Sequence, residues 1–376
     1  MAEPLKKLLN ADAVHAAATQ MRRAWPKFDA RRFEALALQG LDGLELKARA
    51  LQLCASLEAT LPADFAQAAA IIERSLAPIR DDEDLSVLRS SDTGLAGWVV
   101  WPLTEFVARR GQAEPRLALR LLHALTQRFT AEWAIRPFIE SHPELAFATL
   151  ASWTRDPSAH VRRLVSEGSR PRLPWGAQLK GLIQDPSPTL PLLRALQDDP
   201  SAYVRRSVAN HLNDIAKDHP ALIVAWLGEH LPDAPPMRRA LLKHACRTLI
   251  KQGHPQVLKA WGLGRALQGA ASLSVAPLRL RVGEGFDMQV TVDSSLSRAQ
   301  MLLIDYAVHH VKAAGHSAPK VFKGWNVELP ARGELKLAKH HSMRSVTTRR
   351  YHPGRHVVDL RINGVVCAAT FFELSL

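Results

Sequence analysis

The sequence predicts two domains of different fold class: an all-α helical-repeat solenoid over residues 1–268, then a small all-β sandwich over residues 274–376. Two observations support this prediction. A stretch of sequence occurs twice in the first part, 43 residues apart (156 to 199), as expected of stacked helical repeats. After residue 268 the spacing of apolar residues changes from three or four to two, which is the period of β-strands.

The repeated stretch reads Asp156-Pro-Ser-Ala-His-Val-Arg-Arg163 in the first copy and Asp199-Pro-Ser-Ala-Tyr-Val-Arg-Arg206 in the second. An Asp-Pro-Ser start ahead of apolar residues at helical spacing indicates a turn that opens a helix. Self-similarity at this period is typical of HEAT-type repeats, whose helix pairs pack against their neighbours.

Both copies continue as amphipathic helices, with an aliphatic stripe on one side and a polar sector on the other. The polar sector holds Arg163, Ser166, Glu167 and Arg170 in the first copy, and Arg205, Arg206, Asn210, Asn213 and Lys217 in the second, with Asp214 at its edge. A solvated helix surface is the simplest interpretation of such a sector. Because two successive repeats present the same Arg-Arg pair, we instead expect a continuous, exposed concave face for an anionic partner.

The rest of residues 1–268 also reads as helical, with breaks at Pro and Gly. Asp29 ahead of Arg31 and the pair Asp156-Pro157 indicate helix starts. The region before about residue 90 shows no clear repeat, and we expect it to form a helical cap.

Strands are expected at 278–282, 288–292, 302–306 and 357–362, where apolar residues alternate. Asn363-Gly364, between two such runs, predicts a type I′ hairpin turn. Roughly seven strands in about 100 residues indicate an immunoglobulin-like sandwich. The segment from Gly269 to Ser272 reads as an exposed linker, so we expect few contacts to cross it.

Charge and composition limit the classes of partner. The net charge is +13 and the pI is about 10.0, which favours a polyanion. The sandwich domain alone has 14 Lys and Arg residues against 8 Asp and Glu, concentrated in segments 336–341 and 344–350. No run of 18 apolar residues and no secretory signal is readable, so the sequence predicts neither a membrane span nor export.

Motifs for common cofactors are absent. Cys54, Cys246 and Cys367 lie far apart and form no CxxC pair, which fits reduced thiols in a cytosol and predicts no metal site. GxxxxGK[ST], GxGxxG and HExxH do not occur, so neither a nucleotide cofactor nor a zinc-peptidase reaction is expected.

Four residues interrupt the basic character of the helical part: Glu132, Glu167, Asp214 and Trp175. A carboxylate on a phosphate-binding face lowers affinity unless it has another role, although a salt bridge that orients an arginine is an equally good explanation for any one acid. Three acids from successive repeats favour a catalytic site. Trp175 follows a proline and is expected in a loop, with an inter-repeat core position as the alternative.

Three long, ungapped stretches resemble one family: Glu132-Trp-Ala-Ile-Arg-Pro-Phe138, Val161 to Trp175 and Tyr203 to His219. They are similar to AlkC, a family of HEAT-like-repeat DNA glycosylases related to AlkD, and the sandwich resembles the immunoglobulin-like extension of one branch. The resemblance implies excision of 3-methyladenine and 3-methylcytosine from double-stranded DNA, possible on an open face without a base-flipping pocket. It places Glu132, Glu167, Trp175 and Asp214 in the active site. The expected DNA contacts are Arg136, Arg162, Arg163, Arg170, Arg172, Arg205, Arg206, Asn210, Asn213 and Lys217.

These residue types suit that chemistry. A base alkylated at N3 is a cation and leaves without a general acid, so the remaining task is to stabilise an oxocarbenium-like sugar and to orient water, which carboxylates can do. Trp175 can contact the cationic base or sugar. No lysine is obviously placed for a Schiff base, so strand cleavage is not expected.

We expect a monomer in the cytosol, associated with the nucleoid. The alternative is a HEAT-repeat scaffold that binds nucleic acid without catalysis.

Overall fold

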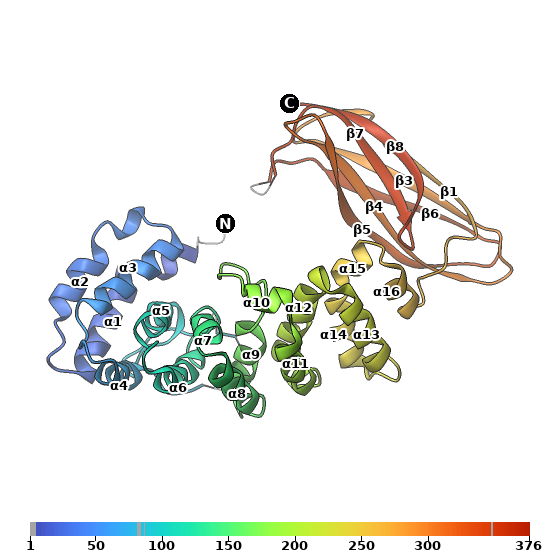
Figure 1. Ribbon diagram of the computed structural model, residues 1–376. Coiled ribbons are helices and arrows are strands. Elements are labelled where there is room, and N and C mark those ends of the chain that lie inside the picture. Colours follow the sequence, from blue (N-terminus) through green and yellow to red (C-terminus); the bar gives the residue numbers. More distant parts are fainter. Residues whose placement is uncertain (1–4, 81–83, 86, 347–348) are drawn as a thin grey trace. The chain divides into compact units, whose positions relative to one another are not determined.

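The computed structural model describes residues 5–80, 84–85, 87–346 and 349–376. The chain divides into two compact units. The first comprises Met1–Asp218 and Pro236–Leu241, and the second comprises His219–Pro235 and Leu242–Leu376. Helices are followed by a β-sandwich along the chain, which confirms the fold class predicted from the sequence (Figure 1).

The first unit is built from short helices that pack in succession (Figure 1). They are α1 (Ala11–Ala24), α2 (Ala30–Leu38), α3 (Leu46–Glu58), α4 (Phe65–Ser75), α5 (Val100–Arg110), α6 (Pro115–Thr126), α7 (Arg136–Ser141), α8 (Pro143–Trp153), α9 (Ala159–Gly168), α10 (Lys180–Gln184), α11 (Leu190–Leu196) and α12 (Ala202–Asp218), with 3₁₀ helices at Leu5–Leu8, Leu41–Gly43, Gly97–Val99 and Ser187–Thr189. The helices of the two sequence copies, α9 and α12, pack directly on each other. Their aliphatic stripes are buried, as the sequence predicts.

The first copy of the repeated sequence is a helix start stabilised by its own side chains. The Asp156 carboxylate accepts a hydrogen bond from the Ser158 N–H at 2.8 Å, and the Arg162 guanidinium donates back to the carbonyls of Asp156 and Pro157 at 2.8 and 2.9 Å. Arg162 also forms a two-point ion pair with Asp199, at 2.6 and 3.0 Å, which joins the first copy to the second.

The second copy repeats this geometry. The Asp199 carboxylate accepts from the Ser201 N–H at 2.9 Å, and Arg205 donates to the carbonyls of Asp199 and Pro200. The first arginine of each pair therefore caps the turn before its own helix. The prediction of a helix start is confirmed here and at Asp29, whose carboxylate accepts from the Arg32 N–H at 3.0 Å at the beginning of α2.

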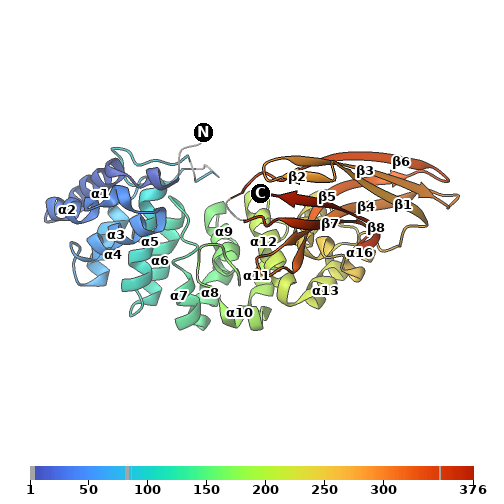
Figure 2. The same cartoon turned by 90° about the horizontal axis from the view of Figure 1, so that it is seen from above.

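The second unit joins the last helices to the sandwich. It contains α13 (Pro220–His230), α15 (Arg247–Lys251), α16 (Pro255–Ala260) and the second half of α14 (Pro236–Ala245). The strands are β1 (Gly269–Ala276), β2 (Arg279–Arg281), β3 (Gly285–Ser294), β4 (Gln300–Val311), β5 (Ser317–Leu329), β6 (Glu334–Ser342), β7 (Gly354–Ile362) and β8 (Val365–Ser375). They form sheets of order β1-β3-β6 and β2-β8-β7-β4-β5, antiparallel except for the β2–β8 pair (Figure 2).

The turn between β7 and β8 is the hairpin that the sequence predicts. Asn363 and Gly364 both have positive φ angles, 51° and 83°, as a type I′ turn requires. The turn also packs on the preceding helices, since the Asn363 amide donates to the Arg265 carbonyl at 2.7 Å. Gly364 lies so close to Gly253 that a Cβ on either residue would approach the other backbone to within 3 Å.

The linker expected at Gly269–Ser272 is wrong. These residues begin strand β1, and Gly269 pairs with Ser294. Leu258 and Leu263 form a small core with Leu303 of β4, so helix α16 and the sandwich share buried apolar surface. The cause is burial: the last helices have apolar faces that the sheet covers, which alternation within one segment does not reveal.

The interior of the sandwich contains imidazoles among its aromatic rings. His310, His341 and His356 are buried; His341 contacts the Tyr306 hydroxyl at 2.9 Å, and His356 stacks on Phe372. Burial lowers the pKa of His310 to about 3 and that of His341 to about 4, so both rings are neutral at pH 7. Of the basic segment 344–350, residues 347–348 lie outside the described residues.

Candidate functional site

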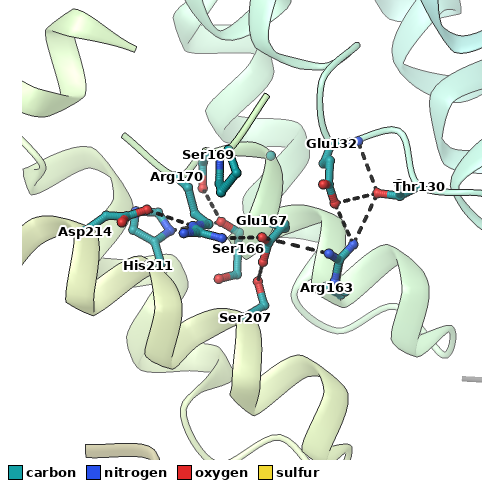
Figure 3. Close-up of polar contacts among 12 residues, drawn as sticks. Thr130, Glu132, Arg163, Ser166, Glu167, Ser169, Arg170, Ser207, His211 and Asp214 are labelled. Carbon is teal, nitrogen blue, oxygen red and sulfur yellow. Dashed lines mark hydrogen bonds and ion pairs between the residues drawn. The ribbon is translucent and has the colours of Figure 1, made fainter. Parts of the chain in front are cut away.

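Three separate parts of the first unit bring carboxylates together. Glu132 lies in the turn before α7, Glu167 in the last turn of α9, and Asp214 in α12 (Figure 3). All three are buried, with exposed fractions of 7%, 5% and 1%. The sequence predicts that these acids belong to one cluster, and the structure places them along a continuous chain of ion pairs.

Arg163 joins the first two acids. Its guanidinium contacts Glu132 Oε2 at 2.8 Å and Glu167 Oε1 at 3.9 Å, and it also donates to the Thr130 hydroxyl at 3.2 Å. The Thr130 hydroxyl donates in turn to the same Glu132 oxygen at 2.7 Å (Figure 3). The ring of Tyr203 lies 5.0 Å from the guanidinium carbon and covers one face of it.

Arg170 joins the second acid to the third. It donates to Glu167 Oε1 at 2.5 Å and to Asp214 Oδ2 at 2.8 Å (Figure 3). Lys217 completes the chain with an ion pair to Asp214 Oδ1 at 2.8 Å. Three carboxylates are thus matched by three cations, two of them arginines with little exposed side-chain surface.

Glu167 is ionised despite its burial. Burial alone would raise the pKa of this carboxyl, but the guanidinium groups of Arg163 and Arg170 and a hydrogen bond from the Ser207 hydroxyl outweigh it and hold the pKa below its usual value. Burial alone would lower the pKa of Arg163, but the carboxylates of Glu132 and Glu167 outweigh this effect and hold the pKa above its usual value. Glu167 and Arg163 are therefore both charged over the physiological pH range.

The acids differ in how far their oxygens are occupied. Glu167 uses Oε1 for the two arginines and Oε2 for Ser207, and Asp214 uses one oxygen for Arg170 and the other for Lys217. In Glu132 only Oε2 has a partner among the described residues. Of the oxygens of these three carboxylates, Glu132 Oε1 is thus the one without a hydrogen bond or ion pair among the described residues.

Trp175 lies in a loop after α9 and is 61% exposed. The prediction of a loop position is confirmed, and the alternative of an inter-repeat core tryptophan is wrong. Its φ angle is 65°, a left-handed conformation that costs free energy in a residue with a side chain. The indole stacks on Trp133, with ring centroids 6.3 Å apart and planes inclined by 21°.

The expectation of an exposed polar sector is wrong for most of the first copy. Ser166, Glu167 and Arg170 are buried because α12 packs over this side of α9. Asn213 is buried for the same reason in the second copy. The 100° periodicity separates apolar from polar residues, but it does not reveal that a polar sector can be covered by a neighbouring helix.

The expected phosphate contact of Arg136 is also contradicted. This residue is 2% exposed, and its guanidinium donates to the carbonyls of Gly168, Arg170 and Ala177. The Arg170 side chain is occupied by Glu167 and Asp214. Both arginines therefore have structural partners where the sequence suggested solvent.

The remaining expected DNA contacts are more accessible. Arg206 and Lys217 are exposed, Asn210 is half-buried, and Arg172 pairs with Asp218 near the surface at 2.8 Å. Arg162 and Arg205 are half-buried at the helix starts that they cap.

His211 is a residue of this region that the sequence did not single out. Its Nδ1 donates to the Ser166 carbonyl at 2.9 Å and ties α12 to α9, whereas Nε2 has no partner among the described residues (Figure 3). Burial lowers the pKa of His211 to about 4, so the ring is neutral. A histidine on a mixed polar and apolar face carries no sequence signal that separates this role from a surface position.

Among the described residues, no group of three or more His, Cys, Asp or Glu side chains is arranged to hold a metal ion. No helix in the described part of the chain is both long enough and apolar enough to cross a bilayer.

Comparisons with known proteins agree with this architecture. Residues 269–376 match the model of a family described as "Uncharacterised protein YhaZ, C-terminal Ig-like domain". The uncharacterized protein YhaZ of Bacillus subtilis (strain 168) is 36% identical over 377 residues, which cover 98% of this chain and 99% of YhaZ. The structure of Pseudomonas fluorescens alkylpurine DNA glycosylase AlkC, bound to DNA containing an abasic site analog, matches with a TM-score of 0.90 and 34% identity over 100% of both chains.

Fold and site together define a helical-repeat protein with a buried acidic cluster and an immunoglobulin-like domain at its C-terminal end. The chain belongs to the AlkC-type alkylpurine DNA glycosylase family, in the branch that carries this C-terminal domain. The resemblance stated from the sequence is thereby confirmed.

Proposed function

We propose that the protein is a monofunctional DNA glycosylase that hydrolyses the N-glycosidic bond of N3-alkylated bases in double-stranded DNA. The substrates are 3-methyladenine and 3-methylcytosine, and the enzyme acts as a monomer in the cytosol, near the nucleoid. The observation that carries this proposal is the convergence of Glu132, Glu167 and Asp214, which are joined by arginines with little exposed side-chain surface.

The cost of this cluster supports a catalytic role. Buried ion pairs lose hydration, and replacing them with well-packed apolar residues is often neutral or stabilising. A scaffold that only binds DNA has no need for three carboxylates in one place, since each repels phosphate. Catalysis requires such charges, because fixed negative groups stabilise the positive charge that develops on the sugar.

Glu132 has the role closest to the reacting sugar in this proposal. Its Oε1 is available while Oε2 is fixed by Thr130 and Arg163, so the carboxylate keeps one orientation. In that orientation Oε1 orients a water molecule toward the anomeric carbon and stabilises the oxocarbenium-like transition state. Glu167 and Asp214 act as fixed negative charges whose oxygens are already occupied.

We assign Trp175 to the same site as an aromatic surface, because its indole stacks on Trp133, the residue that follows Glu132 in the chain. An exposed indole attracts a cationic base or sugar by about 1–2 kcal/mol when water is excluded. Because the ring is on an open surface loop, we propose that the lesion is bound there without rotation into an enclosed pocket. The exposed Arg206 and Lys217 and the half-buried Arg172 are assigned to backbone phosphates, which position the duplex without reading its sequence.

A direct assay tests the proposal. The purified protein is incubated with N-methylated DNA in the absence of metal and nucleotide, and free bases are separated by chromatography. Release of 3-methyladenine and 3-methylcytosine, with the DNA backbone left intact, is the expected result. Tight DNA binding without base release would instead support the alternative of a non-enzymatic repeat scaffold.

A further inference from the structure

The loop that carries Trp175 is anchored by residues that lie far from it in sequence. It leaves α9 at Gly168 and returns toward α10, and the Leu179 N–H bonds to the Pro171 carbonyl at 3.1 Å across its base. Trp175 itself has an unfavourable backbone conformation with φ of 65°. Such a conformation persists only where surrounding contacts impose it.

Arg136 supplies four hydrogen bonds to this loop. Its Nη1 donates to the carbonyls of Gly168 and Arg170 at 2.9 and 2.7 Å, on the side where the loop begins. Its Nε and Nη2 donate to the Ala177 carbonyl, with Nε at 2.8 Å, on the side where the loop ends. One planar guanidinium therefore joins both ends of the loop.

Trp133 supports the middle of the same loop. Its indole N–H donates to the Pro174 carbonyl at 3.2 Å, and its ring stacks on Trp175. The approach is close, because a Cβ on Gly176 would lie 3.1 Å from the Trp133 ring. Trp133 and Arg136 belong to the short segment that also carries Glu132.

The environment of Arg136 does not suit a DNA contact. The side chain is buried, and no ion pair with a carboxylate engages it among the described residues. Burial lowers its pKa to about 10, against the opposing effect of nearby carboxylates. Carbonyl oxygens receive its donors, so reaching a phosphate would require breaking four hydrogen bonds.

We propose that Arg136 is a positioning residue that holds Trp175 in place, with Trp133 as its second support. This inference rests on the proposed function for its catalytic consequence. The loop is then held in one conformation and does not act as a mobile lid. The segment that carries Glu132 also fixes the position of the Trp175 indole. A catalytic carboxylate and its aromatic surface are thus placed by one stretch of chain.

The first experiment reads the position of Trp175 without reference to activity. The full-length protein is labelled with 5-fluorotryptophan, and the Trp175 resonance is assigned with the Trp175→Phe variant. In Arg136→Lys and in the milder Trp133→Phe, this resonance should shift and broaden, while that of Trp226 in the second unit stays unchanged. An unmoved Trp175 resonance in both folded variants would overturn the proposal.

The second experiment separates positioning from phosphate binding. Single-turnover excision by Arg136→Lys should fall about tenfold to 100-fold, the range expected when a reacting group is displaced by about 1 Å. The dissociation constant for DNA and its salt dependence should stay as in the wild type. Arg206→Gln is the comparison for a real phosphate contact and should lower the salt slope by about one. A lowered slope in Arg136→Lys would overturn the proposal.

A double-mutant cycle tests whether Arg136 acts through Trp175. In the Trp175→Ala background, Arg136→Lys should reduce excision by less than about twofold more, because the group it positions is absent. A full further loss would show that Arg136 works by another route and would contradict the inference. If the wild type releases no base while the Trp175 resonance still responds to Arg136→Lys, the proposed function fails and the anchoring of the loop stands.

Discussion

The two copies of the repeated sequence begin identically and end differently. In both, an aspartate caps the turn, and the first arginine returns to the carbonyls of the Asp-Pro pair. These capping contacts agree atom for atom, so local structure explains them, and Arg162 also pairs with Asp199 of the second copy. The shared Arg162 and Arg205 are thus accounted for without a ligand, and their contact with DNA stays a prediction.

The copies diverge at the second arginine. Arg163 turns into the acidic cluster, whereas Arg206 is exposed and has no side-chain partner within the described part of the chain. Four positions later the first copy has Glu167 and the second has Asn210. The repeat thus supplies helix starts, and the site lies where one copy departs from the pattern.

The largest expected effect is a difference in stability between substitutions of Arg163 and of its counterpart Arg206. Arg163→Met leaves the buried carboxylates of Glu132 and Glu167 without their common cation, which typically costs about 3–5 kcal/mol. Arg206→Met should change stability by less than about 0.5 kcal/mol, since an exposed side chain loses no buried contact. The measurement is urea unfolding of both variants, monitored with a spectroscopic probe of the helical unit.

Equal, small losses in the two variants would mean that the ion-pair chain does not stabilise the first unit. Arg163→Lys is a useful third variant. It keeps the positive charge but lacks the planar fork that reaches Glu132, Glu167 and Thr130 together, so its stability should be intermediate.

The next prediction concerns the acids. Glu132→Gln and Asp214→Asn should each lower single-turnover base release by at least tenfold, because loss of one preorganised electrostatic group costs about 2.7–4 kcal/mol. DNA affinity should hold or improve, since a buried negative charge that repels the bound phosphates is removed. Glu144→Gln, which removes an exposed carboxylate from α8, is the matched control. Unchanged excision in both site variants would disprove the assignment of the site.

Much of this site could be predicted from the sequence, because its residues differ in type from the repeat around them. Glu132, Glu167, Asp214 and Trp175 stand out as departures from a basic repeat, and the acids do lie together. The ion-pair chain itself was not predictable. Two of its links are long-range, Glu132 to Arg163 over 31 positions and Arg170 to Asp214 over 44, and they depend on which helix covers which face.

Arg136 shows the limit most clearly. The family resemblance placed this arginine among the DNA contacts, and only the fold reveals that carbonyls of a distant loop surround it. Strands β2, β3, β4 and β7 followed from alternation, and Asn363-Gly364 identified the hairpin. The packing of Leu303 on Leu258 is long-range and was missed.

The second copy also predicts a pH dependence, because His211 stands where the first copy has Gly168. Burial lowers the pKa of His211 to about 4, below the ordinary value of 6.5. Between these values the unfolded chain binds a proton that the folded protein does not, so stability falls as the pH drops from 6.5 toward 4. The slope from this group is at most about 1.4 kcal/mol per pH unit, and it vanishes above pH 6.5.

The measurement compares the unfolding free energies of the wild type and His211→Asn from pH 7 to pH 4.5. Asparagine keeps an N–H donor for the Ser166 carbonyl but does not titrate, so its slope should be smaller. His310 and His341 of the sandwich titrate in the same direction, but they are present in both proteins and cancel in the difference. Parallel slopes would show that His211 is already protonated or solvated in the folded protein.

The smallest expected effect compares neighbouring arginines within the second copy. Arg205→Gln removes the bonds to the Asp199 and Pro200 carbonyls and should lower stability by about 1 kcal/mol, with no change in the salt dependence of DNA binding. Arg206→Gln should leave stability unchanged and reduce the slope of log K against log salt by about one, equally for all DNA sequences. Titrations at several salt concentrations, run beside urea unfolding, measure both quantities. If Arg205→Gln lowers the salt slope instead, its guanidinium leaves the helix start when DNA binds, and the identical first arginines of the two copies are ligand contacts after all.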